Sequence, residues 1–344
     1  MILPAGANWF RKSWPLWALV LVSALIVLGA LMLAGANPGK ALWDLLEKSL
    51  GSADSLTGTL AEVTPLLICG IAVFLALKAG LFNIGVEGQF TTGALAAAVV
   101  TLRVPGFLGI VLAILAGMVT GGIWALPAAA IKAYRGGHEV ITTIMLNNVA
   151  VLLTTALVAG PLKAPTEESP MTTQIAASSY LPDAINRGGL QISAGLPIGL
   201  LLALGLWMWL RRSVAGYELQ ATGANARAAQ FAGINHRRVI MKSMVWSGAF
   251  GGLAGAIQVL SFKHNFIPGL ASGYGFDALG VALLAGNTPL GLLPSAALFG
   301  ILNKGGTSIQ IIDQVPKGIT SVILGLLIVI AASIRYRKMA VSSA

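Results

Sequence analysis

The chain has 344 residues, of which 56% are hydrophobic and only 10% are charged. Soluble domains carry about 25% charged residues, so this composition excludes an ordinary soluble globular protein. The formal net charge is +10, but the basic residues lie between apolar runs, and no nucleic-acid-binding signature accompanies them. We therefore expect a protein embedded in membrane lipid that binds no nucleic acid.

Apolar windows of about 20 residues predict a series of membrane-spanning helices. In chain order these cover residues 14–36, 58–78, 84–103, 106–131, 139–161, 192–210, 243–262, 275–289, 291–306 and 317–334. The first follows Arg11 and Lys12, and we expect it to be retained as a helix, with a cleaved secretory leader as the alternative. The sequence therefore predicts about ten transmembrane helices.

The positions of lysine and arginine predict the orientation of these helices. With the N-terminus inside, 14 of the 22 basic residues fall in the inside segments and 8 in the outside ones. This bias favours both termini in the cytoplasm. The first five spans then run opposite to the second five, as in inverted-repeat transporters. We expect an all-α polytopic membrane protein with two inverted halves, folded as one transmembrane domain over residues 1–344.

Residues 211–242 form the longest predicted cytoplasmic segment. Its alanines favour a short helix from about Asn225 to Ala232, with Asn225 as the N-cap. Phe231 and Ile234 would form a small apolar tip. Because so short a helix is marginal in isolation, we expect it to dock into a groove on another protein. The alternative is a connecting loop whose arginines hold it near anionic lipid.

Two glycine-rich segments place polar groups at membrane depth. The stretch GLFNIGVEGQF covers residues 80–90, and PGLASGYGFDALG covers residues 268–280 in the second half. Irregular, polar backbone at this depth is tolerated where it lines a cavity or is buried in protein. The predicted pathway residues are Phe82, Asn83, Glu87, Gln89, Phe90, Tyr274, Phe276 and Asp277. The alternative is that they only pack helices together.

Glu87 has two further interpretations, because it could pair with Lys78 or stabilise a helix start near Gly88. Asn147 and Asn148 lie in a regular helical run, and we expect them to bridge neighbouring helices. The aromatic residues beside the glycines could offer π faces to a planar ligand, although aromatics are also common at membrane interfaces.

Several motif blocks carry a resemblance to a known family. YELQATGANARAAQFAGI followed by SGAFGGLAGA resembles the ATPase-coupling loop of ABC-importer permeases. With GLFNIGVEGQ and GGHEVITTIMLNN added, residues 60–334 resemble the permeases that import simple sugars and nucleosides, nearest to the nucleoside (guanosine/uridine-type) branch. In this resemblance the coupling residues are Gly223, Asn225, Arg227, Ala228, Ala229, Phe231 and Gly233.

The resemblance implies a multi-pass subunit of the bacterial inner membrane that forms the translocation pathway by alternating access. It also implies a cytoplasmic ABC ATPase, a second, paralogous permease and an extracytoplasmic nucleoside-binding lipoprotein as partners. ATP would be used by the partner subunit, and this chain would bind no cofactor and no metal.

The chain lacks the motifs of an ATPase or a hydrolytic enzyme. It contains no GxxxxGK[ST], HExxH or GxSxG match, and its one cysteine, Cys69, lies inside an apolar run. We therefore expect a transporter subunit without catalytic residues. The alternatives are a sugar or branched-chain amino-acid permease, a proton-coupled carrier that uses Glu87 or Asp277, and a structural or channel subunit.

Overall fold

The computed structural model describes residues 21–33, 35–271 and 273–312, together with scattered positions between 318 and 329. Residues 14–20 of the first predicted span, most of the tenth span and both chain ends lie outside the described residues. A helix over Leu21–Leu33 represents the first span. The predicted location of the termini therefore stays a prediction.

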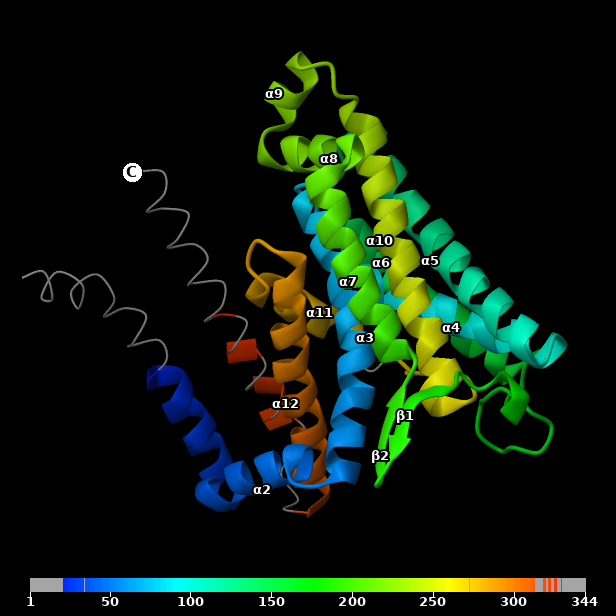
Figure 1. Ribbon diagram of the computed structural model, residues 1–344, viewed down its shortest axis with the longest axis vertical. Helices are drawn as coiled ribbons and strands as arrows, with labels where there is room; N and C mark the ends of the chain where they lie inside the picture. Colours follow the sequence, from blue (N-terminus) through cyan, green and yellow to red (C-terminus); the bar gives the residue numbers. More distant parts are fainter. Residues whose placement is uncertain are drawn as a thin grey trace, which may run out of the picture.

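Helices make up most of the described chain (Figure 1). The long ones are α3 (Ala53–Lys78), α4 (Val86–Arg103), α5 (Phe107–Arg135), α6 (Glu139–Ala159), α7 (Gly195–Arg212), α10 (His236–Gln258) and α12 (Leu292–Ile312). The shorter ones are α2 (Pro38–Leu50), α8 (Val214–Ala224), α9 (Ala226–Phe231) and α11 (Tyr274–Leu284). A π-helical turn over Val259–Lys263 extends α10, and short 3₁₀ turns cover Ala177–Ser179 and Pro289–Gly291.

Among the described helices, fewer are long and apolar enough to cross a membrane than the ten spans that the sequence predicts. Four helices are long and apolar enough to cross a bilayer, namely α3, α5, α6 and α10 with its π-helical extension. The number rises to six if each of two bent pairs, Leu21–Leu33 with α2 and α7 with α8, counts as one span. The chain is thus a multi-helix membrane protein, and the count of ten stays a prediction.

Helix α3 forms the centre of the bundle. Its side chains are buried without interruption from Val63 to Ala76, and it packs against α7, α10, α11 and α12. A helix that is apolar all round belongs in such a position, because every face finds a protein neighbour. Helix α3, from the first half of the chain, therefore packs against four helices of the second half.

Small residues bring α4, α5 and α10 into close contact. A Cβ on Gly252 would lie 2.0 Å from the carbonyl oxygen of Gly117, and one on Gly93 would lie 2.4 Å from Gly252 Cα. A Cβ on Gly248 would likewise lie 2.5 Å from the carbonyl oxygen of Gly121. Close backbone approach is the usual packing mode of membrane helices, where hydrophobic burial adds little. The glycines of SGAFGGLAGA therefore form a packing seam.

The structure corrects the expectation of an all-α fold at one place. Strands β1 (Asp183–Arg187) and β2 (Leu190–Ser193) form an antiparallel hairpin in the predicted outside loop. Gly188 and Gly189 have φ of 58° and 83°, which a two-residue hairpin turn with left-handed backbone requires. A second difference is that α10 begins at His236, so residues 236–242 of the predicted cytoplasmic segment are already helical.

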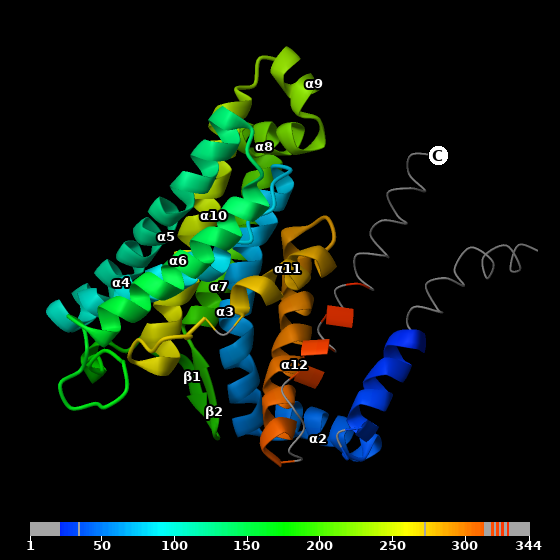
Figure 2. The ribbon, with the colours of Figure 1, turned by 180° about the vertical axis from the view of Figure 1, so that it is seen from behind.

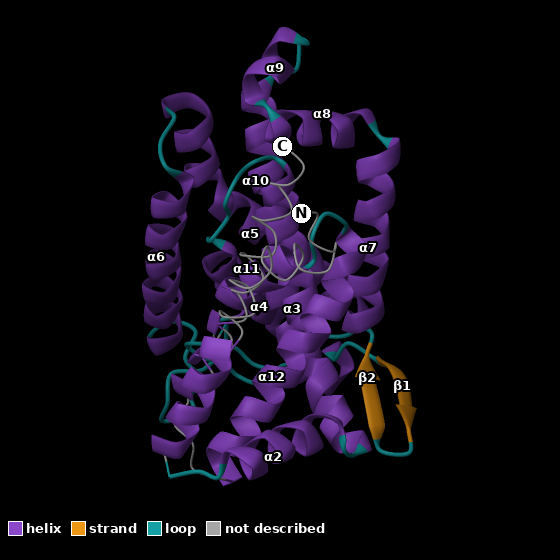
Figure 3. Ribbon diagram, turned by 90° about the vertical axis from the view of Figure 1, so that its left-hand side faces the viewer, coloured by secondary structure: helices purple, strands orange, loops and turns teal. Residues whose placement is uncertain are grey.

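The elements at the two ends of the bundle differ. Helices α8 and α9 project from one end, and α2 and the hairpin lie at the other (Figures 1 and 3). Helices α6 and α7 stand on opposite sides of the bundle (Figure 3), and the rear view in Figure 2 again shows α8 and α9 at the end opposite to α2. The α8–α9 projection corresponds to the segment expected to be cytoplasmic.

Candidate functional site

The glycine-rich turn between α3 and α4 is held by the buried amide of Asn83. Its nitrogen donates to Gln89 Oε1 at 3.0 Å and to Ser247 Oγ at 2.7 Å. Ser247 in turn donates to the carbonyl oxygen of Ala72 at 2.6 Å. The oxygen of Asn83 accepts from the Gly85 N–H at 3.0 Å, the hydrogen bond of an Asx turn. Buried polar groups that bond one another in this way join α3, α4 and α10.

A second amide, from α6, fixes the start of α4. Asn147 Oδ1 accepts from the Gly88 N–H at 2.9 Å, and its Nδ2 donates to the carbonyl oxygen of Ile84 at 2.9 Å. The predicted bridging role is therefore confirmed for Asn147. It is wrong for Asn148, whose exposed amide donates within its own helix to the carbonyl oxygen of Ile144 at 3.2 Å.

Glu87 joins the two glycine-rich segments. Its carboxylate accepts from the backbone N–H groups of Gly273 at 2.9 Å and Gly275 at 2.7 Å, at the N-terminus of α11. A carboxylate is favourable there because it meets unpaired N–H groups and the positive end of the helix dipole. The sequence offered a helix start near Gly88 as one role for Glu87, and the residue does lie in the first turn of α4. Its carboxylate also caps a second helix, α11, which the sequence did not predict. Lys78, the other partner that the sequence offered for Glu87, donates to the Asn287 carbonyl oxygen at 2.9 Å.

The aromatic residues Phe90 and Tyr274 meet beside this junction, with ring centroids 5.7 Å apart and planes tilted by 37°. The Tyr274 hydroxyl donates to Glu62 Oε2 at 2.7 Å. Sequence reasoning missed Glu62, although a carboxylate within the apolar run of α3 is itself a signal for a partner or a function. The structure places it where α3 and α11 pack.

Phe82, Phe276 and Asp277 lie nearer the surface of the same region. Phe82 and Phe276 are 46% and 47% exposed, whereas Asn83, Gln89 and Phe90 are at most 1% exposed. Asp277 is half-buried and accepts from Asn303 Nδ2 at 2.9 Å. Glu87, Phe90 and Tyr274 thus meet where the two glycine-rich segments join, and the eight predicted pathway residues include both buried and exposed side chains in this conformation.

An ion pair that the sequence did not predict supports the same turn. Lys132 Nζ lies 2.7 Å from Glu139 Oε2 across the α5–α6 connection. The Phe82 N–H also donates to Glu139 Oε1, in a long bond of 3.4 Å. The end of α5 and the start of α6 are therefore connected to the turn that carries the candidate site.

The predicted coupling helix forms as α9. Asn225 caps it, because its Oδ1 accepts from the Ala228 N–H at 3.0 Å, which confirms the predicted N-cap. Gly233 follows the helix with φ of 82°. Ala229 is buried and Phe231 is 95% exposed. A fully exposed phenylalanine on a six-residue helix is an unpartnered apolar tip.

Helix α8 connects this tip to the candidate site. A Cβ on Gly223, at the end of α8, would lie 2.1 Å from the carbonyl oxygen of Lys78 and 2.9 Å from the Gly80 nitrogen. Arg227, the remaining predicted coupling residue, is exposed on α9. The projection therefore touches the backbone at the first residues of the GLFNIG turn.

These features define a polytopic membrane protein with a helical projection in contact with a polar junction between its two halves. The chain belongs to the family described as the permease component of the branched-chain amino acid transport system, whose model matches residues 55–332. It is therefore a permease subunit of an ABC transporter.

Similar proteins include the guanosine ABC transporter permease protein NupP of Bacillus subtilis, at 35% identity over 87% of this chain and 86% of that protein. The nucleoside ABC transporter permease protein NupB of Lactococcus lactis subsp. cremoris is 32% identical over 91% of this chain and 88% of that protein. The glucose ABC transporter permease protein TsgB13 of Haloferax volcanii is 30% identical over 95% and 91%, respectively.

Proposed function

We propose that the chain forms the translocation pathway of a nucleoside importer and works by alternating access driven by a separate ABC ATPase. The observation that carries this proposal is the contact between the α8–α9 projection and the α3–α4 turn. Phe231 presents an exposed aromatic ring at the tip, and aromatic residues are enriched in protein–protein interfaces. Gly223 then meets Lys78 at the base of the projection. A displacement of the bound ATPase would therefore be transmitted through α8 to the α3–α4 turn.

The substrate assignment rests on the relatives and on the side chains at the junction. Two of the relatives named above are permeases for guanosine or nucleosides. Phe82 and Phe276 present half-exposed rings, and base–aromatic stacking contributes about 1–3 kcal/mol per base. Asp277 and Glu87 supply carboxylates that can accept from ribose hydroxyls. A nucleoside uses both kinds of group.

The buried residues of the candidate site are not available to substrate in this conformation. Asn83, Gln89 and Phe90 contact no solvent in this conformation, so they would meet substrate only after the helices rearrange. Until then they hold the turn in place. The pathway assignment is strongest for the exposed residues Phe82 and Phe276.

The partners follow from the surfaces left uncovered. Only 22% of the apolar window of α6 is buried within this chain, and Ile141, Met145 and Leu152 are exposed along it. We assign this face to the second, paralogous permease. The ATPase would bind α9, a nucleoside-binding lipoprotein would deliver substrate to the opposite end, and the complex would reside in the bacterial inner membrane. ATP would bind the partner subunit, with no cofactor on this chain.

A competition panel tests the substrate class. Uptake of a radiolabelled nucleoside by cells that express the complete importer is measured against excess unlabelled nucleosides, glucose and branched-chain amino acids. The proposal predicts competition by nucleosides alone. Glucose is the second candidate because of the 30% identity to TsgB13, and competition by glucose alone would replace the nucleoside assignment.

A further inference from the structure

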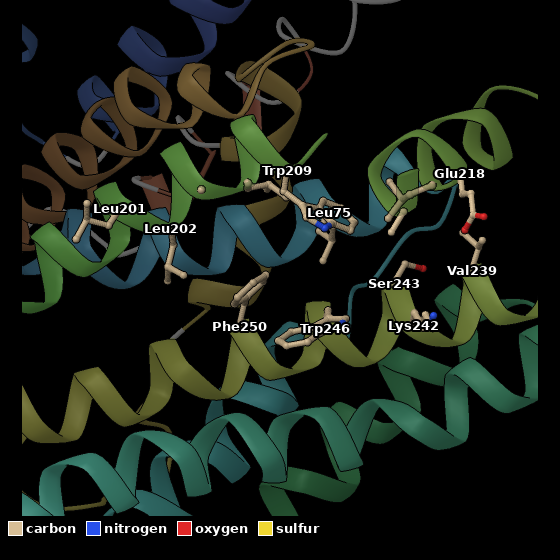
Figure 4. Close-up of a pocket in the computed structure, with 14 residues that line it drawn as sticks. Leu75, Leu201, Leu202, Trp209, Glu218, Val239, Lys242, Ser243, Trp246 and Phe250 are labelled. Carbon is tan, nitrogen blue, oxygen red and sulfur yellow. The ribbon is translucent and has the colours of Figure 1, made fainter. Parts of the chain in front are cut away.

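An apolar groove of about 510 Å³ runs between α7 and α10 (Figure 4). Leu201 and Trp209 line it from α7, Trp246 and Phe250 line it from α10, and Leu75 of α3 forms part of its floor. Its volume falls within the ~300–1,000 Å³ of typical small-molecule sites. Helix α7, which forms one wall of the groove, stands on the side of the bundle opposite to α6 (Figure 3). This wall therefore lies away from the surface that we assign to the second permease.

The end of this groove beside α8 carries two opposite charges. Figure 4 shows Glu218 of α8 and Lys242 of α10 at this end, with the hydroxyl of Ser243 between them. Neither charge forms an ion pair with another residue in the described part of the chain. One end of the groove thus offers a carboxylate and an ammonium group, and the rest offers hydrocarbon.

Tryptophan and arginine side chains place this end at the level of the membrane interface. The Arg211 guanidinium lies 4.7 Å from the centroid of the Trp207 ring, and Trp209 and Trp246 are partly exposed in the groove. Tryptophan concentrates at the boundary between acyl chains and headgroups. Trp246 also lines a second apolar groove of about 360 Å³ between α5 and α10. Two apolar grooves on either side of α10 provide room for two acyl chains.

We propose that this site binds a zwitterionic phospholipid with an ammonium headgroup, of the phosphatidylethanolamine class. The lipid phosphate lies beside Lys242 and the headgroup ammonium beside Glu218, while an acyl chain follows the groove past Trp209 and Phe250. A purely anionic lipid fits less well, because Glu218 would repel it. Since Glu218 and Ala215 belong to α8, the headgroup touches the same segment that contacts the α3–α4 turn.

Native mass spectrometry of the purified, delipidated full-length chain in detergent tests the proposal. The protein is titrated with phosphatidylethanolamine and, separately, with phosphatidylglycerol of identical acyl chains. We expect tighter binding of phosphatidylethanolamine. Lys242→Gln should weaken it about fivefold, the effect of one interfacial charge. Glu218→Gln should abolish the preference between the two lipids. The matched controls Lys48→Gln and Glu47→Gln change exposed charges on α2 and should leave both affinities unchanged.

A third variant tests the apolar part of the site. An added Cβ at Gly205 meets no atom within 4 Å, so Gly205→Phe fills the groove without a clash at its base. It should displace the bound lipid while the chain remains folded and membrane-inserted. Equal binding of the two lipids by the wild type, or unchanged binding in Gly205→Phe, would overturn the proposal. Loss of the second permease subunit from the purified Gly205→Phe complex would also overturn the proposal, because the groove would then be the binding site of that subunit and not of a lipid. These readouts do not depend on transport.

Discussion

Gly223 at the end of α8 lies against the backbone of Lys78 at the end of α3, so closely that a Cβ would lie 2.1 Å from the Lys78 carbonyl oxygen. The α3–α4 turn begins one residue after Lys78 and leads to Asn83 and Glu87, which join it to α10 and α11. One contact thus connects the exposed projection to the junction of the two halves. Packed elements of this kind transmit displacement because the interior is nearly incompressible.

The first prediction concerns this contact. Gly223→Val should push α8 away from α3, because the added atoms overlap backbone that cannot rotate away. Overpacking of this kind costs about 1–3 kcal/mol. We expect uptake to fall at least tenfold while ATPase binding persists, as measured by transport and by copurification. Gly29→Val, on a helix where an added Cβ meets nothing within 4 Å, is the control. Equal uptake by both variants would show that the contact has no part in transport.

The second prediction concerns the exposed tip. Phe231→Ala should change the thermal stability of the chain by no more than ~0.5 kcal/mol, since the ring is 95% exposed. It should weaken ATPase association by more than ~1 kcal/mol, the threshold of a significant interface residue. Affinity for the purified ATPase measures this effect. Phe107→Ala, which removes an 81% exposed ring from α5 at the opposite end, should leave that affinity unchanged. Unchanged ATPase affinity in Phe231→Ala would remove α9 from the interface.

The third prediction separates two roles of Glu87. Glu87→Ala leaves the N–H groups of Gly273 and Gly275 without their acceptor, so it should destabilise α11 by about 1–2 kcal/mol. We expect uptake per molecule inserted in the membrane to fall further than expression does. Glu87→Gln keeps one acceptor oxygen but turns its NH2 donor toward the other N–H group, so it should recover only part of the stability and less of the uptake. Parallel losses of expression and uptake would reduce Glu87 to a structural residue.

The fourth prediction concerns the buried amide network. Asn83→Ala leaves Gln89 without its partner in the interior and should lower stability by about 1–3 kcal/mol. A thermal-shift measurement in detergent reports the change. Asn148→Ala removes an exposed amide from α6 and should be close to neutral. A small, equal shift in both variants would contradict the importance of the network.

Local sequence signals predicted several of these features. The Asn225 cap followed from side-chain chemistry within four residues, and glycine density identified both segments that Glu87 joins. These features could be predicted because they depend on residues that are close together in the sequence.

Other features depend on contacts between distant segments, which a single sequence does not reveal. The bonds from Tyr274 to Glu62 and from Asn83 to Ser247 depend on how α3, α10 and α11 pack. Gly188 and Gly189 were a local signal for the 183–193 hairpin, but the polar residues around them are equally typical of a surface loop.

The central claim is that a separate ATPase drives transport through the α8–α9 projection. Its most direct test is nucleoside-stimulated ATP hydrolysis by the complete importer in proteoliposomes, with Ala228→Glu and Gly233→Glu combined on this chain. We expect the wild-type complex to hydrolyse ATP faster when the loaded binding protein is added, and the double variant to insert normally but lose that stimulation. Full stimulation in the double variant would contradict the claim.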